Sequence, residues 1–512
     1  MSLGANKQAL MGASGAAGGA GGGFYTHQIA NSIRMPATSS TASSNSKLKR
    51  TVGTPDSNVH FTLNFWIKRS AIGGNNPVGG VRPLVFFTPI SGTSGSTLME
   101  FKFSGPTAGN SAGDSLMIVN TSSNAIVLST DNVYRDTSAW YNIHIQADAD
   151  NGTNSEKLKI FVNGTETNYN TDNRGSYSSF PGIAAGRWTI GDYYDGSYPI
   201  QSYFAQFCYI DGTTYAASDF GETKNGVWIP KDPSGLTFGS EGYYLDFAAS
   251  GDLGNDVSGN NNDWELENLA AHDQMLDSPT FGSSSSGNFC TFIPLTGDTT
   301  NIDFSEGNLK ASTNDNIEGM VCSFGLPLGG KYYWEMTQAG WSGSNGDDLR
   351  VGVNTLTQPD FQNNRGGDDT SYSIAASGQK VILGTASAYG TTIRTGNVIG
   401  VAVDRVNHTI EFYHNGSGDG TFSIASTGDL FPWIGVGGGF SESITLMNFG
   451  ADSSFAGQSG LDGTSAGAAD ENGHGDFYDT PPSGFLALCT GNLPIADAID
   501  PAQTDDNYPQ KL

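Results

Sequence analysis

The sequence predicts an all-β protein made of two β-sandwiches in series behind an extended N-terminal arm. Residues 399–416 read IGVAVDRVNHTIEFYHNG, in which two runs of alternating apolar residues flank a turn. This alternation is typical of half-buried strands. The same pattern occurs at residues 140–164, WYNIHIQADADNGTNSEKLKIFVNG. A hairpin needs a second sheet over its apolar face, so two distant copies indicate two sandwiches.

Length and composition agree with this fold class. A chain of 512 residues is long enough for two to four domains of about 150 residues. The chain contains 70 Gly and only 15% charged residues, and no long helical periodicity is present. Aromatic residues make up 11% of the chain, which favours a loop-rich β protein over a disordered one.

Charge is unevenly distributed along the chain. The formal net charge is −27, yet residues 1–50 contain no Asp or Glu. The acidic body should repel nucleic acid, and the basic arm suggests docking on an acidic partner. The alternative is a disordered leader whose charge bias arises by chance. The cations of this arm are Lys7, Arg34, Lys47, Lys49 and Arg50.

The cysteines and the N-terminus suggest neither a zinc site nor membrane insertion. Cys208, Cys290, Cys322 and Cys489 are far apart and form no CxxC pair, which argues against structural zinc. The Gly-interrupted start of the chain lacks the pattern of a signal peptide, and no stretch approaches about 20 apolar residues. We expect a soluble protein that is made in a cytosol.

Residues 1–54 are predicted to be a Gly/Ala-rich basic arm that anchors the protein. Residues 1–23 are low-complexity Gly/Ala sequence, which cannot form a core of its own but can lie in a groove of another chain. Phe24 and Tyr25 are apolar anchors ahead of a Ser/Thr-rich linker.

Residues 55–222 show strand patterns at intervals of about 8–12 residues, which indicates a sandwich. The segments FTLNFWIKR, WYNIHIQAD, KLKIFVNGTE and WTIGDYYDGSYPIQSYFAQFCYIDG resemble, in their order, a laminin-G-like, concanavalin-type jelly roll. Residues 223–287 are turn-rich and are interpreted as a junction and linker.

Residues 288–450 contain the second sandwich. KYYWEM, DLRVGV, the hairpin at 399–416, LFPWIGV and ITLMNFG follow one another, and this succession resembles a SPRY domain, which is also concanavalin-like. Residues 451–512 are expected to form a tail whose PPSGFLALCTGNLP segment packs back on the second sandwich.

The whole chain resembles virion proteins of tailed bacteriophages. The resemblance rests on the Gly/Ala leader, the two modules and the segments FYTHQIANSIRM, DSPTFGSSSSGNFCTF and GFLALCTGNLP. It implies a tail or surface fibre located in the virion, and such fibres are usually homotrimers.

The residue patterns do not indicate an enzyme. Some concanavalin-like sandwiches cleave glycans with a Glu-x-Asp-x-x-Glu strand, which places two carboxylates beside the scissile bond; this signature is absent. Glu100, Glu335 and Glu411 are isolated within their predicted strands. No GxSxG nucleophile elbow and no P-loop occur.

Two kinds of loop are candidates for ligand binding, because sugar rings stack on aromatic side chains while polar groups bind the hydroxyls. The alternative is that the aromatic residues cap the sandwich ends and the acids keep the loops soluble. Calcium is a possible ligand of the acidic pairs at 347–348 and 368–369, although EF-hand spacing is absent. The candidates are Tyr193, Tyr194, Asp195 and Tyr198 in one loop, and Trp341, Asp347, Asp348 and Asp368 in the others.

The resulting hypothesis is a non-enzymatic, structural virion protein without a cofactor. Its arm, through Lys7, Phe24, Tyr25 and Arg34, would bind other virion proteins, and its sandwiches would bind host-surface glycan. Nucleic-acid binding and membrane insertion are not expected. The alternatives are a capsid decoration or tail assembly protein that binds no glycan, and a polysaccharide depolymerase.

Overall fold

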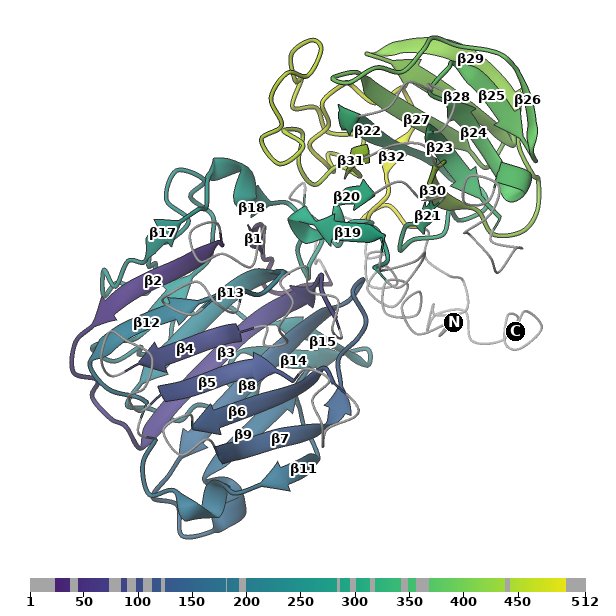
Figure 1. The fold of residues 1–512 in the computed structure, drawn as a ribbon. Coiled ribbons are helices and arrows are strands. Elements are labelled where there is room, and N and C mark those ends of the chain that lie inside the picture. Colours follow the sequence, from purple (N-terminus) through teal and green to yellow (C-terminus); the bar gives the residue numbers. More distant parts are fainter. Residues whose placement is uncertain are drawn as a thin grey trace. The chain divides into compact units, whose positions relative to one another are not determined.

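A computed structural model of the chain shows its fold (Figure 1). The structure describes residues 24–36, 45–72, 84–89, 98–104, 113–120, 125–180, 182–192, 199–282, 286–294, 301–313, 318–341, 349–355, 368–437 and 443–493.

The predicted all-β fold class is confirmed. The helices within the described ranges are three-residue 3₁₀ turns, and none of them is long enough to cross a membrane. These turns are η1 Asn154–Glu156, η2 Arg174–Ser176, η3 Ala217–Asp219, η4 Ala271–Asp273, η5 Glu306–Asn308 and η6 Asp368–Thr370.

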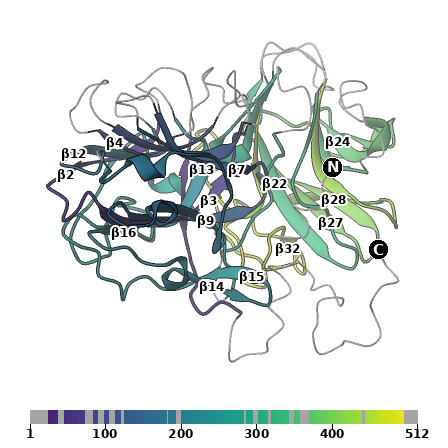
Figure 2. The ribbon, with the colours of Figure 1, turned by 90° about the horizontal axis from the view of Figure 1, so that it is seen from below.

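The chain divides into two compact units. The N-terminal unit comprises Thr26–Met275 and Ser305–Gly307, and the C-terminal unit comprises Met1–Tyr25, Leu276–Phe304 and Asn308–Leu512. Each unit is built from β-sheets that form its own layers (Figures 1 and 2).

The N-terminal unit contains two large sheets and a small one. The first sheet has the order β10-β9-β8-β3-β13-β1-β18, with β16 also paired to β13. Its strands are β1 Ser32–Met35, β3 His60–Arg69, β8 Trp140–Asp148, β9 Leu158–Val162, β10 Thr165–Glu166, β13 Ser202–Asp211, β16 Tyr243–Leu245 and β18 Gln274–Met275.

The second large sheet has the order β11-β7-β6-β5-β4-β12-β2-β17, and β14 pairs with β15 in the small sheet. The strands are β2 Lys47–Val52, β4 Leu84–Pro89, β5 Leu98–Phe103, β6 Ser115–Asn120, β7 Ala125–Val133, β11 Tyr169–Asp172, β12 Gly186–Ile190, β14 Gly221–Lys224, β15 Val227–Pro230 and β17 Glu265–Glu267.

Alternating apolar residues of the two large sheets form the core of the N-terminal unit. Phe65 of β3 stacks on Phe207 of β13, with ring centroids 4.9 Å apart. Trp188 of β12 meets Tyr209 edge to face at 5.0 Å. A bulge in β13 at Gln206, whose φ is +46°, shifts the alternation so that both Phe204 and Phe207 are buried in this core.

The first two strands belong to the N-terminal unit, which differs from the predicted arm at residues 1–54. β1 lies between β13 and β18, and β2 lies between β12 and β17. Residues 223–275, which were interpreted as part of a junction, supply the end of β14 and all of β15 to β18 of the same unit. These strands are short; β14 and β15 pair with each other, whereas β16, β17 and β18 pair with β13, β2 and β1, which lie much earlier in the sequence.

The C-terminal unit contains two sheets. The first has the order β19-β20-β31-β22-β27-β28-β29, with β32 paired to β22. Its strands are β19 Ile302–Ser305, β20 Lys310–Thr313, β22 Lys331–Trp341, β27 Val398–Asp404, β28 Thr409–His414, β29 Ser417–Ser423, β31 Ser443–Asn448 and β32 Leu486–Ala487.

The second sheet of this unit has the order β21-β30-β23-β24-β25-β26. Its strands are β21 Glu318–Val321, β23 Leu349–Asn354, β24 Ser371–Ala375, β25 Gln379–Ile382, β26 Thr385–Ala388 and β30 Phe431–Val436.

The hairpin predicted at residues 399–416 forms β27 and β28. Val403 pairs with Ile410 and Val401 pairs with Phe412, and all four side chains are fully buried. The following turn contains Asn415, whose φ is +48°, as expected for an Asn-Gly turn.

Candidate functional site

Of the ligand-binding candidates predicted from the sequence, the described residues include only Trp341 and Asp368. Trp341 is the last residue of β22, and Asp368 is the first residue of η6; the structure describes their backbone and not their side chains. The remaining candidates, which lie outside the described residues, are Tyr193, Tyr194, Asp195, Tyr198, Asp347 and Asp348.

The predicted anchoring residues that the structure describes are buried. Phe24 and Tyr25 are 7% and 9% exposed, and Tyr25 meets Phe281 edge to face at 5.3 Å. Burial raises the pKa of Tyr25 above its ordinary range. These two rings therefore help to build the core of this chain. Lys7, the fourth predicted anchor, lies outside the described residues.

Arg34 is also buried, which corrects its expected role in docking. Its guanidinium lies 3.3 Å from a carboxylate oxygen of Asp273 and 3.4 Å from one of Glu306. Its Nη2 atom also donates to the backbone carbonyl of His272. All of these partners belong to the N-terminal unit, so this charge is neutralised within the fold.

The other cations of the predicted arm that the structure describes, Lys47, Lys49 and Arg50, are paired as well. Lys47 and Lys49 lie 2.9 and 3.0 Å from carboxylate oxygens of Glu267, and Arg50 lies 2.7 Å from one of Glu241. The ion pairs of Lys47 and Lys49 join β2 to β17, whereas Glu241 lies ahead of β17. They also leave less positive charge for an acidic partner than the composition suggested.

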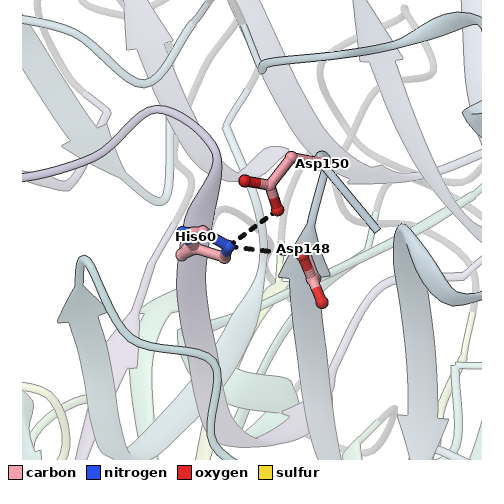
Figure 3. Close-up of side chains that lie close together, drawn as sticks. All are labelled: His60, Asp148 and Asp150. Carbon is pink, nitrogen blue, oxygen red and sulfur yellow. Dashed lines mark hydrogen bonds and ion pairs between the residues drawn. The ribbon is translucent and has the colours of Figure 1, made fainter. Parts of the chain in front are cut away.

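His60, Asp148 and Asp150 form a cluster that the sequence analysis did not predict (Figure 3). Nε2 of His60 lies 3.0 Å from Oδ1 of Asp150 and 3.3 Å from Oδ1 of Asp148. One donor atom of each side chain lies within 4.8 Å of the other two. The side chains of His60, Asp148 and Asp150 are 36%, 26% and 64% exposed.

Strand register places these three side chains together. His60 begins β3, Asp148 ends β8, and the two residues pair directly. The amide of Ala149 donates to the carbonyl of Val59 at 3.0 Å, which fixes the turn that carries Asp150. The sequence signal was a histidine at the start of one strand and two acids at the end of another, but it becomes meaningful only when β3 is known to pair with β8.

The Asp148 carboxyl is held in its ionised form. Its partial burial opposes ionisation, but hydrogen bonds with Asn151 and Asp150 and the interaction with His60 outweigh that effect, so its pKa lies below the ordinary value. Nδ2 of Asn151 donates to Oδ2 of Asp148 at 2.9 Å. Oδ1 remains directed at His60 (Figure 3).

Glu335 of β22 is a fully buried carboxyl group of the C-terminal unit. Oε1 accepts the amide of Asp479 at 2.7 Å, and Oε2 accepts the amide of Tyr478 at 2.8 Å. The side-chain amide of Asn448 and the hydroxyl of Tyr333 also donate to the Glu335 carboxylate oxygens. Burial raises the pKa of Glu335 to about 8, while the amide donors act in the opposite direction. This carboxyl fastens the tail to β22, which is a structural role.

Comparison with known proteins identified one family for part of the chain. The SPRY domain family model matches residues 331–451, which overlap the sandwich at residues 288–450 that the sequence predicted to be SPRY-like. No curated protein sequence matches the chain.

Many solved structures are similar to part of the chain, and three examples follow. A stonustoxin structure has 19% identity and a TM-score of 0.25, and the match covers 31% of this chain and 27% of that one. The SPRY domain of human HERC1 has 17% identity and a TM-score of 0.24, with 28% and 88% covered. The PSpry domain of TRIM65 has 17% identity and a TM-score of 0.25, with 31% and 91% covered.

Proposed function

Because residues 331–451 form a SPRY domain, we propose that the chain is a non-enzymatic binding protein. SPRY domains are typically protein-interaction modules rather than enzymes, and this domain is the observation that carries the proposal. The buried Glu335 supports it, because its oxygens accept hydrogen bonds from four groups of the protein itself.

We further propose that this binding protein is a structural part of a bacteriophage virion, either a tail fibre or a surface fibre. The resemblance of the leader, the two modules and the closing segment to phage virion proteins supports this role. The N-terminal residues would attach the protein to other virion proteins, and the sandwiches would bind host-surface glycan. A homotrimer would strengthen weak binding at each site, because linked sites raise the effective concentration.

A second candidate is a capsid decoration or tail assembly protein that binds another virion protein and no glycan. The SPRY domain favours this candidate, since such domains generally mediate protein interactions. The two proposals differ in the chemistry of the ligand, and one binding experiment distinguishes them.

The experiment measures binding of the full-length protein to lipopolysaccharide purified from host cells. Replacing Tyr193, Tyr194 or Trp341 with Ala should weaken binding about tenfold, because ring contacts with an aromatic side chain are worth about 0.5–1.5 kcal/mol beyond the area that they bury. Tyr193→Phe is the matched control, since it keeps the ring and removes only the hydroxyl.

The possible results separate the candidates. Tight binding that is unchanged in the three Ala variants would exclude these loops as the glycan site. Absence of binding to lipopolysaccharide and to host cells, together with incorporation into particles, would favour the decoration protein. Release of sugars from host polysaccharide would overturn the non-enzymatic assignment.

A further inference from the structure

We propose that His60, Asp148 and Asp150 bind a divalent transition-metal ion of the zinc type. A zinc ion binds imidazole nitrogen and carboxylate oxygen at about 2.0–2.2 Å in tetrahedral geometry. Two ligand atoms of such an ion are therefore about 3.3–3.5 Å apart. The distances from Nε2 of His60 to Asp150 and to Asp148 are 3.0 and 3.3 Å, so small adjustments would place one ion among the three atoms (Figure 3).

Hydrogen bonding alone leaves this arrangement incompletely satisfied. Nε2 of an imidazole carries at most one hydrogen, yet two carboxylate oxygens approach the same nitrogen. One oxygen of each carboxylate also lies within 4.8 Å of an oxygen of the other. A divalent cation would neutralise both negative charges and would use the nitrogen lone pair.

The framework of the site is fixed before any ion binds. His60 and Asp148 are paired residues of neighbouring strands, and Oγ of Ser57 accepts the His60 amide at 3.0 Å. The Asn151 side chain holds the other oxygen of Asp148 at 2.9 Å. Such outer contacts orient metal ligands and raise metal affinity.

The ligand set selects the class of metal. Calcium and magnesium prefer six or more oxygen ligands, whereas imidazole favours zinc and neighbouring transition metals. Asp150 is 64% exposed, so the outward side of the cluster can supply water ligands. This assignment differs from the calcium ligands that the sequence suggested at residues 347–348 and 368–369.

The test is calorimetric titration of ZnCl₂ into the full-length protein after chelator treatment and removal of any affinity tag. The wild-type protein should bind zinc at one saturable site. Asp150→Asn and His60→Asn should each lower the zinc affinity at least about tenfold, because each removes one of three ligands. Asp131→Asn, which changes an exposed acid of β7, is the matched control and should leave the affinity unchanged.

Two further measurements make the result specific. The Asp150→Asn protein should melt at the wild-type temperature in chelator, since the side chain is largely exposed. Cobalt(II) should give visible absorption bands with the wild-type protein that are lost in this variant. The proposal is overturned if wild type binds no zinc saturably, if both ligand variants bind like wild type, or if calcium binds more tightly than zinc.

Discussion

At the scale of single residues, the cations near the start of the chain contribute to the fold. Arg34, Lys47, Lys49 and Arg50 pair with acids from residues 241–306. The sequence showed a basic segment, but composition cannot show whether a charge faces a partner molecule or a distant part of its own chain. Burial distinguishes these cases: the Arg34 side chain is fully buried, whereas that of Lys49 is 25% exposed.

Arg34→Met is expected to lower the free energy of unfolding by about 3–5 kcal/mol, because it leaves the buried Asp273 without its cation. Lys49→Met is the matched control and should cost about 1 kcal/mol or less, since its pair is partly exposed and solvent-screened. Urea unfolding followed by tryptophan fluorescence measures both. Equal losses for the two variants would show that the Arg34 pair has no special role.

At the scale of elements, the two Asn-Gly turns around β9 differ in what they require of glycine. Gly164 has a φ of +75°, and a Cβ atom there would lie 2.3 Å from the ring of Trp228. Gly152 has no atom within 4 Å of the same position. The sequence predicted both turns, but it could not show that Trp228 covers only one of them.

Gly164→Ala should therefore destabilise the N-terminal unit by about 2–4 kcal/mol, through backbone strain and overpacking against Trp228. Gly152→Ala should change stability by about 0.5 kcal/mol or less. Thermal unfolding of the two variants measures the difference. A Gly164→Ala protein as stable as wild type would mean that the indole ring moves away without cost.

The strongest sequence patterns were the most reliable predictors of structure. The hairpins at residues 140–164 and 399–416 form as expected, because alternation and turn chemistry are local properties. β1 and β2 were missed because their identity as strands depends on β18 and β17, more than 200 residues later. The cluster of His60, Asp148 and Asp150 was missed for the same reason, because His60 and Asp150 are 90 positions apart in the sequence.

At the scale of the whole molecule, the N-terminal unit extends from residue 26 to residue 275. The sequence patterns predict only residues 55–222 for this sandwich, because the flanking segments have the composition of an arm and a junction. This difference changes where the chain can be shortened in a test of particle attachment.

Deletion of residues 1–23 should leave the melting temperature unchanged, because β1 and β2 remain. It should abolish incorporation into particles if the leader is the anchor.

Deletion of residues 1–54 should prevent folding of the N-terminal unit. It removes Ile33, Met35, Leu48 and Val52, which are buried, and about 1.5–3 kcal/mol of apolar burial for each. That sum is comparable to the whole stability of a domain.

Melting temperatures and particle incorporation of both truncated proteins decide these points. If the protein that lacks residues 1–23 is incorporated into particles normally, the leader is not the anchor. A folded protein after the longer deletion would show that β1 and β2 are dispensable.

The Glu335 carboxyl has a consequence for the order of events during protein synthesis. Its amide donors, at Tyr478 and Asp479, follow it by 143 and 144 residues. At about 5–20 residues per second, a ribosome needs roughly 7–30 s to make that stretch. Throughout this interval β22 lacks the donors that satisfy its buried carboxyl, so the C-terminal unit completes its fold only after residue 479 has left the ribosome. A nascent chain arrested before that point should therefore be the form most dependent on chaperones.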